Sequence, residues 1–356
     1  MTPRTMSSMG VSLAGVGVLL VAGWFLLGLF NAAAISVLIL ALFFAVGGSS
    51  FSFLYSSLGV FSLAQPVFLA VGGYTAIYLA TRYGISPWIS LLIAPVIATV
   101  VALPIALAIV RAGTGPILGA LVTLVIAEAV PPLLIAVQPL GGAVGLYAQV
   151  KQNPTLWQMQ FVSGLPFARI LLVLNVMIIA FVIWWRRSRF GHFDTAIKDA
   201  PYAASAIGIP TARMRVATFL ISAMIAAPAG VIYAQYNLLT SADLFLGSTV
   251  LFQIVVVALA GGTARPWGPL VGSLAVVYLS QEASDLANGR SGIGPLTFAA
   301  IFAVMAFVMP TGISGTWEKL LHWTAIRRGF RRGSPAEQDD SPPTPESAGS
   351  SRKMPA

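Results

Sequence analysis

The chain has no cysteine, and this absence excludes several kinds of site at once. Without thiols there is no disulfide framework, no cysteine nucleophile and no thiolate metal site. Histidine is scarce too, since His192 and His322 are the only two and lie far apart, outside the apolar segments. We therefore expect no metal site and no cofactor bound to this chain.

Charged residues make up only 9% of the 356 residues, whereas 57% are hydrophobic. A chain this apolar lies mostly in a lipid bilayer rather than around a soluble core. A helix needs about 20 apolar residues to cross a bilayer. The sequence predicts an all-α polytopic membrane protein with about ten transmembrane helices, some of them broken or short. The expected spans are a first run ending at Phe30, then about 32–47, 49–80, 87–110, 117–137, 170–185, 216–236, 249–259, 269–280 and 295–309.

The formal net charge of +9 could indicate a nucleic-acid partner, but the basic residues stand at span ends and in short loops. That distribution is a topology signal and predicts no nucleic-acid binding. With ten spans the two termini share one side, where sixteen of the 20 lysines and arginines fall. We therefore expect both termini in the cytoplasm. The other four basic residues, which are expected on the side away from the termini, are Arg82, Lys151, Arg169 and Arg290.

Two regions are expected, a transmembrane domain over residues 1–326 and a disordered cytoplasmic tail over residues 327–356. The tail is rich in proline, serine and charge, a composition that does not form a packed core. The first apolar run is too long for a usual signal-peptide core, so we expect a retained helix, with cleavage as the alternative.

The longest charged interruption between spans is the loop Arg186–Arg215. Within it Asp199 can cap a short helix, Pro201 suits the first turn and Gly208 can end the helix. A helix of about two turns is not stable alone in water and must dock on something. Its face is small and apolar at Ala203 and Ala206, with basic residues beside it. We expect a cytoplasmic docking element for another protein.

Glycines, serines and Pro66 interrupt the apolar segment Ser49–Ala80. In lipid, irregular backbone is tolerated where protein covers it or where it lines a water-filled cavity. The segment is therefore expected to line a transport path, with a closely packed helix as the alternative. The polar residues expected along the path are Ser62, Gln65, Tyr74 and Thr123, and the alternative for each is ordinary interhelical hydrogen bonding. The glycines expected to bring helices close are Gly72, Gly73, Gly261, Gly262, Gly268 and Gly272.

Glu128 is the only carboxylate deep inside a predicted span, and Pro131 and Pro132 follow it and are expected to break the helix. An ionisable residue within the membrane is costly and usually faces a bundle interior or a cavity. We treat Glu128 as a pathway candidate. The alternative is a buried side chain bonded to backbone groups that the prolines release.

No segment matches a phosphate-binding G-x-x-x-x-G-K-[ST] loop, and no catalytic side-chain arrangement is credible within the spans. The chain is therefore not expected to be an enzyme. The glycine-interrupted path and the docking loop indicate a pore-forming subunit that receives force from another protein. The alternative is a secondary transporter that couples uptake to protons through Glu128, and a membrane scaffold fits poorly.

The stretch RSRFGHFDTAIKDAPYAASAIGI, residues 187–209, resembles the cytoplasmic loop of the LivM-type permeases of branched-chain amino acid ABC importers. That family's pattern is close to RSxFGRALRAIRDNExAAEALGI. Two further stretches are similar to the family, GVFSLAQPVFLAVGGYTA at residues 59–76 and AGGTARPWGPLVGS at residues 260–273. The resemblance extends over most of the membrane region, in family order.

The resemblance implies a multi-pass permease of the bacterial inner membrane. Its partners would be a second related permease, two cytoplasmic ATP-binding subunits that use the ATP, and a periplasmic solute-binding protein. Branched-chain amino acids are the expected substrate, with urea or short amides as the alternative. The resemblance carries the ATPase-coupling role onto Asp199, Ala203, Ala204, Ala206 and Gly208.

Overall fold

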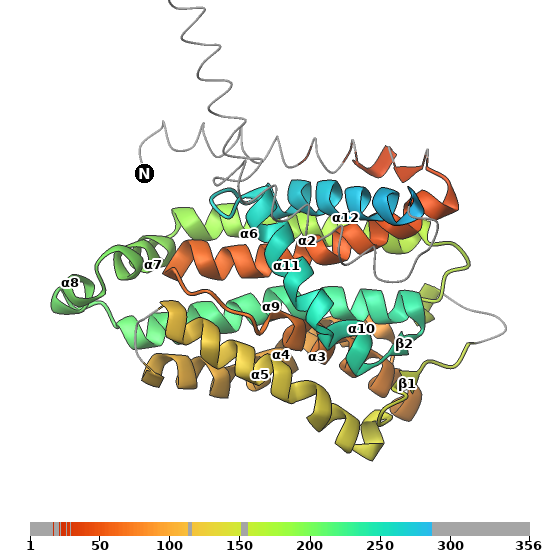
Figure 1. Ribbon diagram of the computed structural model, residues 1–356, viewed down its shortest axis with the longest axis horizontal. Helices are drawn as coiled ribbons and strands as arrows, with labels where there is room; N and C mark the ends of the chain where they lie inside the picture. The colour runs from red at the N-terminus through yellow and green to blue at the C-terminus, as the bar shows by residue number, and fades with distance from the viewer. Residues whose placement is uncertain are drawn as a thin grey trace, which may run out of the picture. The chain divides into compact units, whose positions relative to one another are not determined.

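The computed structural model describes residues 17, 21, 23–25, 27–28, 30–112, 116–150 and 156–286 (Figure 1). The expected last span at 295–309, the tail at 327–356 and most of the first span lie outside these residues. The chain divides into two compact units, Met1–Thr316 and Trp317–Ala356, and all described residues belong to the first.

The described part of the chain is mostly helical, which confirms the predicted fold class at that level. The long helices are α2 (Ala32–Leu58), α3 (Gln65–Tyr83), α4 (Pro87–Ala112), α5 (Pro116–Ala136), α6 (Leu165–Arg187), α9 (Thr211–Asn237), α11 (Ser248–Gly261) and α12 (Gly268–Leu286). The short ones are η1 (Gln138–Leu140), η2 (Leu156–Gln158), α7 (Arg189–Asp199), α8 (Pro201–Ala206) and α10 (Ala242–Leu246). Two short strands, β1 (Leu146–Tyr147) and β2 (Leu239–Thr240), pair antiparallel and depart from a purely helical chain.

Six described helical segments are long and apolar enough to cross a membrane. The nineteen-residue helices α3 and α12 are not among them, so the predicted total of about ten spans is not reached in the described residues. The six segments are Ala32–Leu58, Pro87–Arg111, Leu118–Ala136, Leu165–Arg187, Thr211–Asn237 and Ala242–Gly261.

Helix α9 lies at the centre of the bundle, between α2 on one side and α3 and α4 on the other (Figure 1). Its buried positions are mostly small, and Ala223, Ala226 and Ala229 are fully buried. Small side chains let neighbouring helix backbones approach closely. In lipid no hydrophobic effect drives helices together, so van der Waals contacts at such approaches stabilise the bundle. Close backbone contacts along α9 are therefore one part of how the bundle packs.

One close helix crossing joins α3 to α9 at Gly72 and Gly230. A Cβ on Gly72 would overlap the carbonyl oxygen of Ala227, and one on Gly230 would overlap that of Leu69. A second crossing joins α11 to α12, where Gly261, Gly268 and Gly272 each lie against backbone of the opposite segment. Gly73, by contrast, leaves room for the ring of Phe245.

The irregular backbone expected across Ser49–Ala80 is confined to the residues between α2 and α3. Helix α2 runs unbroken through its serines and ends where Gly59, with φ +70°, donates its N–H to Tyr55 O. Pro66 stands in the first turn of α3, where a missing N–H costs no helical hydrogen bond. The expected break in α5 is wrong, since Pro131 and Pro132 lie inside that helix.

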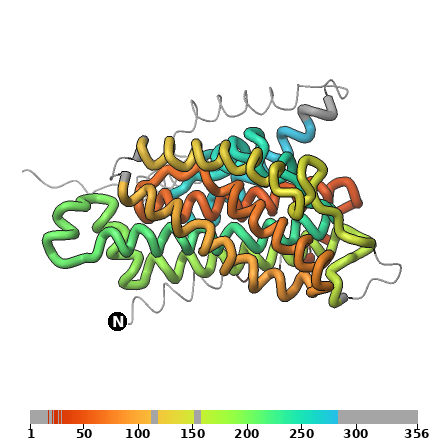
Figure 2. Tube along the Cα trace, turned by 90° about the horizontal axis from the view of Figure 1, so that it is seen from below, coloured from red at the N-terminus to blue at the C-terminus, as the bar shows by residue number. Residues whose placement is uncertain are grey.

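The two ends of the bundle carry different structures. Helices α7 and α8 project at one end, and the β1–β2 pair lies at the other, as Figures 1 and 2 both show. Helix α10 precedes α11, and the chain turns between them at Gly247. Together these two helices form the span expected to be short at 249–259.

Candidate functional site

The loop between α6 and α9 folds into two helices, α7 and α8, which we call the coupling hairpin. The sequence predicted only one short helix, because α7 has too many charges to stand out as apolar. Ser188 caps α7 by accepting the N–H of Gly191 at 3.4 Å. The expected capping role of Asp199 is wrong: it is the last residue of α7, and Ala200 occupies the N-cap of α8 without a side-chain bond.

Helix α8 presents an exposed apolar surface at the tip of the hairpin. Tyr202 is 82% exposed and Ile207 77% exposed, and Ala203 and Ala206 are exposed beside them. Ala204, in contrast, is buried within the chain and cannot itself contact a partner. Gly208 has φ +88°, a left-handed conformation that suits glycine and stands just after the helix, as expected.

Two of the basic residues expected beside the docking surface instead bind other parts of the same chain. Arg186 donates to Ser56 Oγ at 2.8 Å and to the carbonyl oxygens of Ala264 and Thr263. Lys198 donates to Ser56 O at 3.2 Å. These bonds tie the base of the hairpin to the C-terminal end of α2 and to the loop between α11 and α12.

Asp194, which the sequence did not single out, is the most buried carboxylate of the hairpin, with 0% exposure. Its Oδ2 accepts the indole N–H of Trp185 at 2.9 Å. Thr218 Oγ1 lies 3.0 and 3.2 Å from its two oxygens. Burial raises the pKa of Asp194 to about 6, although both hydrogen bonds act in the opposite direction. Asp194 lies three residues after Gly191 and three before Ile197, which are also buried. This helical spacing is the feature of the sequence that could have pointed to Asp194.

Gln65 lies in a buried polar cluster that joins three helices. Its Nε2 donates to Ser222 Oγ of α9 at 3.1 Å, and its Oε1 lies 2.9 Å from Ser50 Oγ of α2. Ser50 Oγ also lies 2.6 Å from the carbonyl oxygen of Ser222. The amide of Gln65 is thus hydrogen-bonded between helices, which is the alternative stated for each of the predicted pathway residues.

The other predicted pathway residues occupy separate buried positions. Thr123 accepts the N–H of Leu63 at 2.9 Å and so satisfies backbone in the irregular segment before α3. Ser62 accepts from the N–H of Ala64 at 3.4 Å. Tyr74 is 6% exposed, and its hydroxyl has no hydrogen-bond partner among the described residues. The structure therefore does not bring these residues into one described cavity.

Glu128 is exposed on α5, so of the two expected settings, the bundle interior or a cavity, the first does not hold within the described part of this chain. Ser248, the first residue of α11, lies 3.4 Å from Glu128 Oε1 and donates to it. The side chains around it on the same helix are apolar and exposed, including Leu121, Val125 and Leu133. The arrangement places one carboxylate and one hydroxyl within an otherwise apolar surface.

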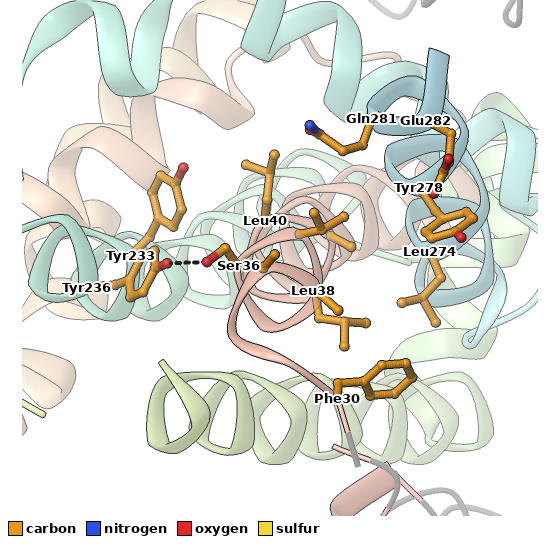
Figure 3. A pocket seen from close by; sticks show the side chains of 14 residues that line it. Phe30, Ser36, Leu38, Leu40, Tyr233, Tyr236, Leu274, Tyr278, Gln281 and Glu282 are labelled. Carbon is orange, nitrogen blue, oxygen red and sulfur yellow. Dashed lines mark hydrogen bonds between the residues drawn. The ribbon is translucent and has the colours of Figure 1, made fainter. Parts of the chain in front are cut away.

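An apolar pocket of about 930 Å³ lies between α2, α9 and α12 (Figure 3). Tyr236 donates to Ser36 Oγ at 3.0 Å along one wall, and Gln281 and Glu282 supply polar groups from α12. None of the pathway residues predicted from the sequence lines it. Its lining is Phe30, Ala33, Ala34, Ser36, Val37, Leu38, Leu40, Ala41, Tyr233, Tyr236, Leu274, Tyr278, Gln281 and Glu282.

The family model described as "Branched-chain amino acid transport system / permease component" matches residues 33–310. The chain belongs to this family. A probable branched-chain amino acid transport permease protein LivH from Methanocaldococcus jannaschii is 24% identical over 290 residues, which cover 75% of this chain and 87% of that relative. The high-affinity branched-chain amino acid transport system permease proteins LivH of Salmonella typhimurium and Escherichia coli are 31% identical over 156 residues, 42% of this chain and 47% of theirs.

Family membership confirms the permease function predicted from the sequence, and with it a multi-pass membrane protein. These relatives are transport permeases and not enzymes, in line with the expected absence of catalysis. They carry the LivH name, so the LivM subtype stays a prediction. No solved structure matches the chain.

Proposed function

We propose that the chain is one permease subunit of an ATP-driven importer of small organic solutes, with branched-chain amino acids as the leading substrate. The observation that carries the proposal is the exposed apolar tip of α8, held on a buried base at one end of an apolar bundle of this family. The partners would be two cytoplasmic ATP-binding subunits, a second related permease and a periplasmic solute-binding protein. Urea or short amides are the alternative cargo within the same family.

The proposed setting is the inner membrane, with both termini and the coupling hairpin in the cytoplasm. The six candidate spans, α3, α12 and the two apolar runs outside the described residues would make about ten crossings. Helix α8 would seat in a groove of an ATP-binding subunit. Closure of that subunit on ATP would then push on α6 and α9, because the hairpin connects these two helices directly.

We place the solute path at the exposed face of α5. A carboxylate that faced lipid near the middle of a span would cost about 2.5–3.5 kcal/mol or more. A second permease against this face, with water between the two chains, would remove that cost for Glu128. The Gln65 cluster supports this placement, because its polar groups are already paired inside the bundle.

A second candidate function is favoured by the exposure of Glu128 and its contact with Ser248. A carboxylate that reaches water could take up and release a proton, as an ion-coupled secondary transporter requires. That function predicts uptake by this chain alone, driven by a pH gradient. The ATP-driven importer predicts no such uptake.

The docking role of α8 is tested with Ile207→Asp in the full chain, co-expressed with the ATP-binding subunits. A charge in a docked apolar contact should reduce co-purification of those subunits and ATP-driven uptake by at least tenfold. Val162→Asp is the matched control, since Val162 is also exposed, at 102%, but precedes α6. Wild-type co-purification and uptake by Ile207→Asp would contradict the docking role.

A further inference from the structure

We propose that Asp194 is a positioning residue for energy coupling, which fixes the coupling hairpin to α6 and α9 so that force on α8 moves both helices together. The inference rests on the proposed function, because it assigns a role within the same hairpin. It concerns a residue that neither the sequence motifs nor the family match singled out. Asp194 touches no solute or nucleotide in this account and acts only through the elements it joins.

Asp194 connects three helices at one point. It lies in the middle of α7, and its carboxylate receives the indole N–H of Trp185 from the last turns of α6 and the hydroxyl of Thr218 from the first turns of α9. Both donors are themselves buried, Trp185 at 7% and Thr218 at 0% exposure. Hydrogen bonds to an ionised carboxylate are shorter and about twice as strong as neutral ones. The two hydrogen bonds therefore fix the orientation of α7 relative to α6 and α9 as well as its distance from them.

The rest of the hairpin base is held in the same place. Gly191 packs its backbone against the carbonyl of Trp185, where a Cβ would overlap. The rings of Trp185 and Phe190 stack with centroids 5.4 Å apart and planes inclined by 18°. Arg186 and Lys198 both bind Ser56 of α2. Among the described residues, the hydrogen bonds of α8 are all to its own turns and flanking residues. The base is therefore where movement of the tip would be transmitted.

Stability does not explain a carboxylate at this position. Its two donors are neutral, and a buried charge that lacks a charged partner costs more desolvation than an apolar side chain of similar size. An apolar residue could fill the space but could not bind an indole and a hydroxyl in two fixed directions. The carboxylate thus holds α6, α7 and α9 in fixed relative orientations, while its burial raises its pKa to about 6.

The ionised form should be the one that positions the hairpin, because a protonated carboxyl loses charge assistance and gains an O–H that needs an acceptor. Coupling should therefore fall as the pH at the cytoplasmic face drops through about 6. His192, on the same helix, is exposed. The other charged or titratable groups on α7 and on the helices packed against it, α2, α6, α8 and α9, are Tyr55, Arg169, Arg186, Arg187, Arg189, Lys198, Asp199, Tyr202, Arg213, Arg215, Tyr233 and Tyr236.

The first test measures solute imported per ATP hydrolysed by the complete reconstituted importer. Asp194→Asn should lower this ratio at least threefold at pH 7.5, without lowering the thermal midpoint of the permease or its co-purification with the ATP-binding subunits. The wild-type ratio should fall between pH 7.5 and 5.5 on the ATP side, and the Asn variant should lose that dependence. An unchanged ratio overturns the proposal, as does a fall in ratio that only follows lost stability. A pH dependence that survives in the variant belongs to another group and also overturns the proposal.

A matched threonine pair separates this contact from general packing. Thr218→Val removes the hydroxyl that binds Asp194, whereas Thr195→Val removes an exposed hydroxyl on α7 that bonds only to Gly191 O of its own helix. The first should lower the coupling ratio in the same way as Asp194→Asn, and the second should not. Equal effects of the two variants would count against a directional role for Asp194.

The second test does not depend on the proposed function. Because the chain has no cysteine, two spin labels can be placed without background, at Tyr202→Cys on α8 and Arg111→Cys at the end of α4. Distances are measured by pulsed electron double resonance on the isolated full chain in nanodiscs. Asp194→Asn should broaden the distance distribution at pH 7.5. An unchanged distribution overturns the inference, whereas absence of ATP-driven uptake by the wild type would instead overturn the proposed function.

Discussion

The α3–α9 crossing gives a sharp prediction for Gly72→Ala. The added methyl group would overlap the carbonyl oxygen of Ala227, and backbone cannot rotate away as a flexible side chain can. Overpacking of this kind costs about 1–3 kcal/mol. For a chain of this size we expect a thermal midpoint lower by about 2–6 °C in detergent, from roughly 2 °C per kcal/mol.

Gly119→Ala is the matched control for this variant. A Cβ at Gly119 would meet only Val60 Cγ1 at 3.6 Å and Ile109 Cγ2 at 3.8 Å, which are ordinary contacts. Alanine is also favoured over glycine in a helix by up to about 1 kcal/mol, so this midpoint should stay level or rise. The double variant Gly72→Ala/Gly230→Ala should cost less than the sum of its single changes, because the first already separates the helices. Equal midpoints for Gly72→Ala and Gly119→Ala would refute the reasoning.

Three further predictions follow from single contacts. Thr123→Val should lose about 1–2 kcal/mol of stability, because the N–H of Leu63 loses its acceptor. Thr123→Ser keeps a hydroxyl acceptor and should keep most of that stability. Equal thermal midpoints for the Val and Ser variants would contradict this prediction. Glu128→Gln should lower ATP-driven uptake in the complete importer without lowering the thermal midpoint of the isolated chain, since the side chain is exposed there; unchanged uptake would argue against a path at α5. Asp194 binds protons more tightly in the folded chain, with pKa raised from 3.8 to about 6, so stability should fall by up to about 3 kcal/mol as pH rises through roughly 4 to 6. Thermal midpoints measured across that range should show this slope in the wild type and lack it in Asp194→Asn.

The sequence predicted the helical membrane fold because hydropathy follows directly from composition. Runs of about 20 apolar residues admit few structures in lipid other than helices. The prediction that Gly208 ends the short helix is also confirmed, because the residue just after the helix has a positive φ, which favours glycine. These features depend on local sequence alone.

Features that depend on tertiary contacts were harder to predict. Helix α2 continues through its serines because Ser50 finds partners on α3 and α9, which no local pattern reveals. Glu128 was expected to face the bundle interior or a cavity, and which of the two holds depends on which face of α5 its neighbours cover. Asp194 went unnoticed because a carboxylate in a charged loop normally faces water, and its two donors lie on helices that only the fold brings together.

We predict that this chain moves solute only when an ATP-hydrolysing partner pushes on the coupling hairpin. The most direct measurement is uptake of labelled branched-chain amino acids into proteoliposomes that contain the permease pair and the solute-binding protein, with and without the ATP-binding subunits. We predict accumulation only when those subunits and ATP are both present. Accumulation by the permease chain alone, driven by a pH gradient, would contradict the account.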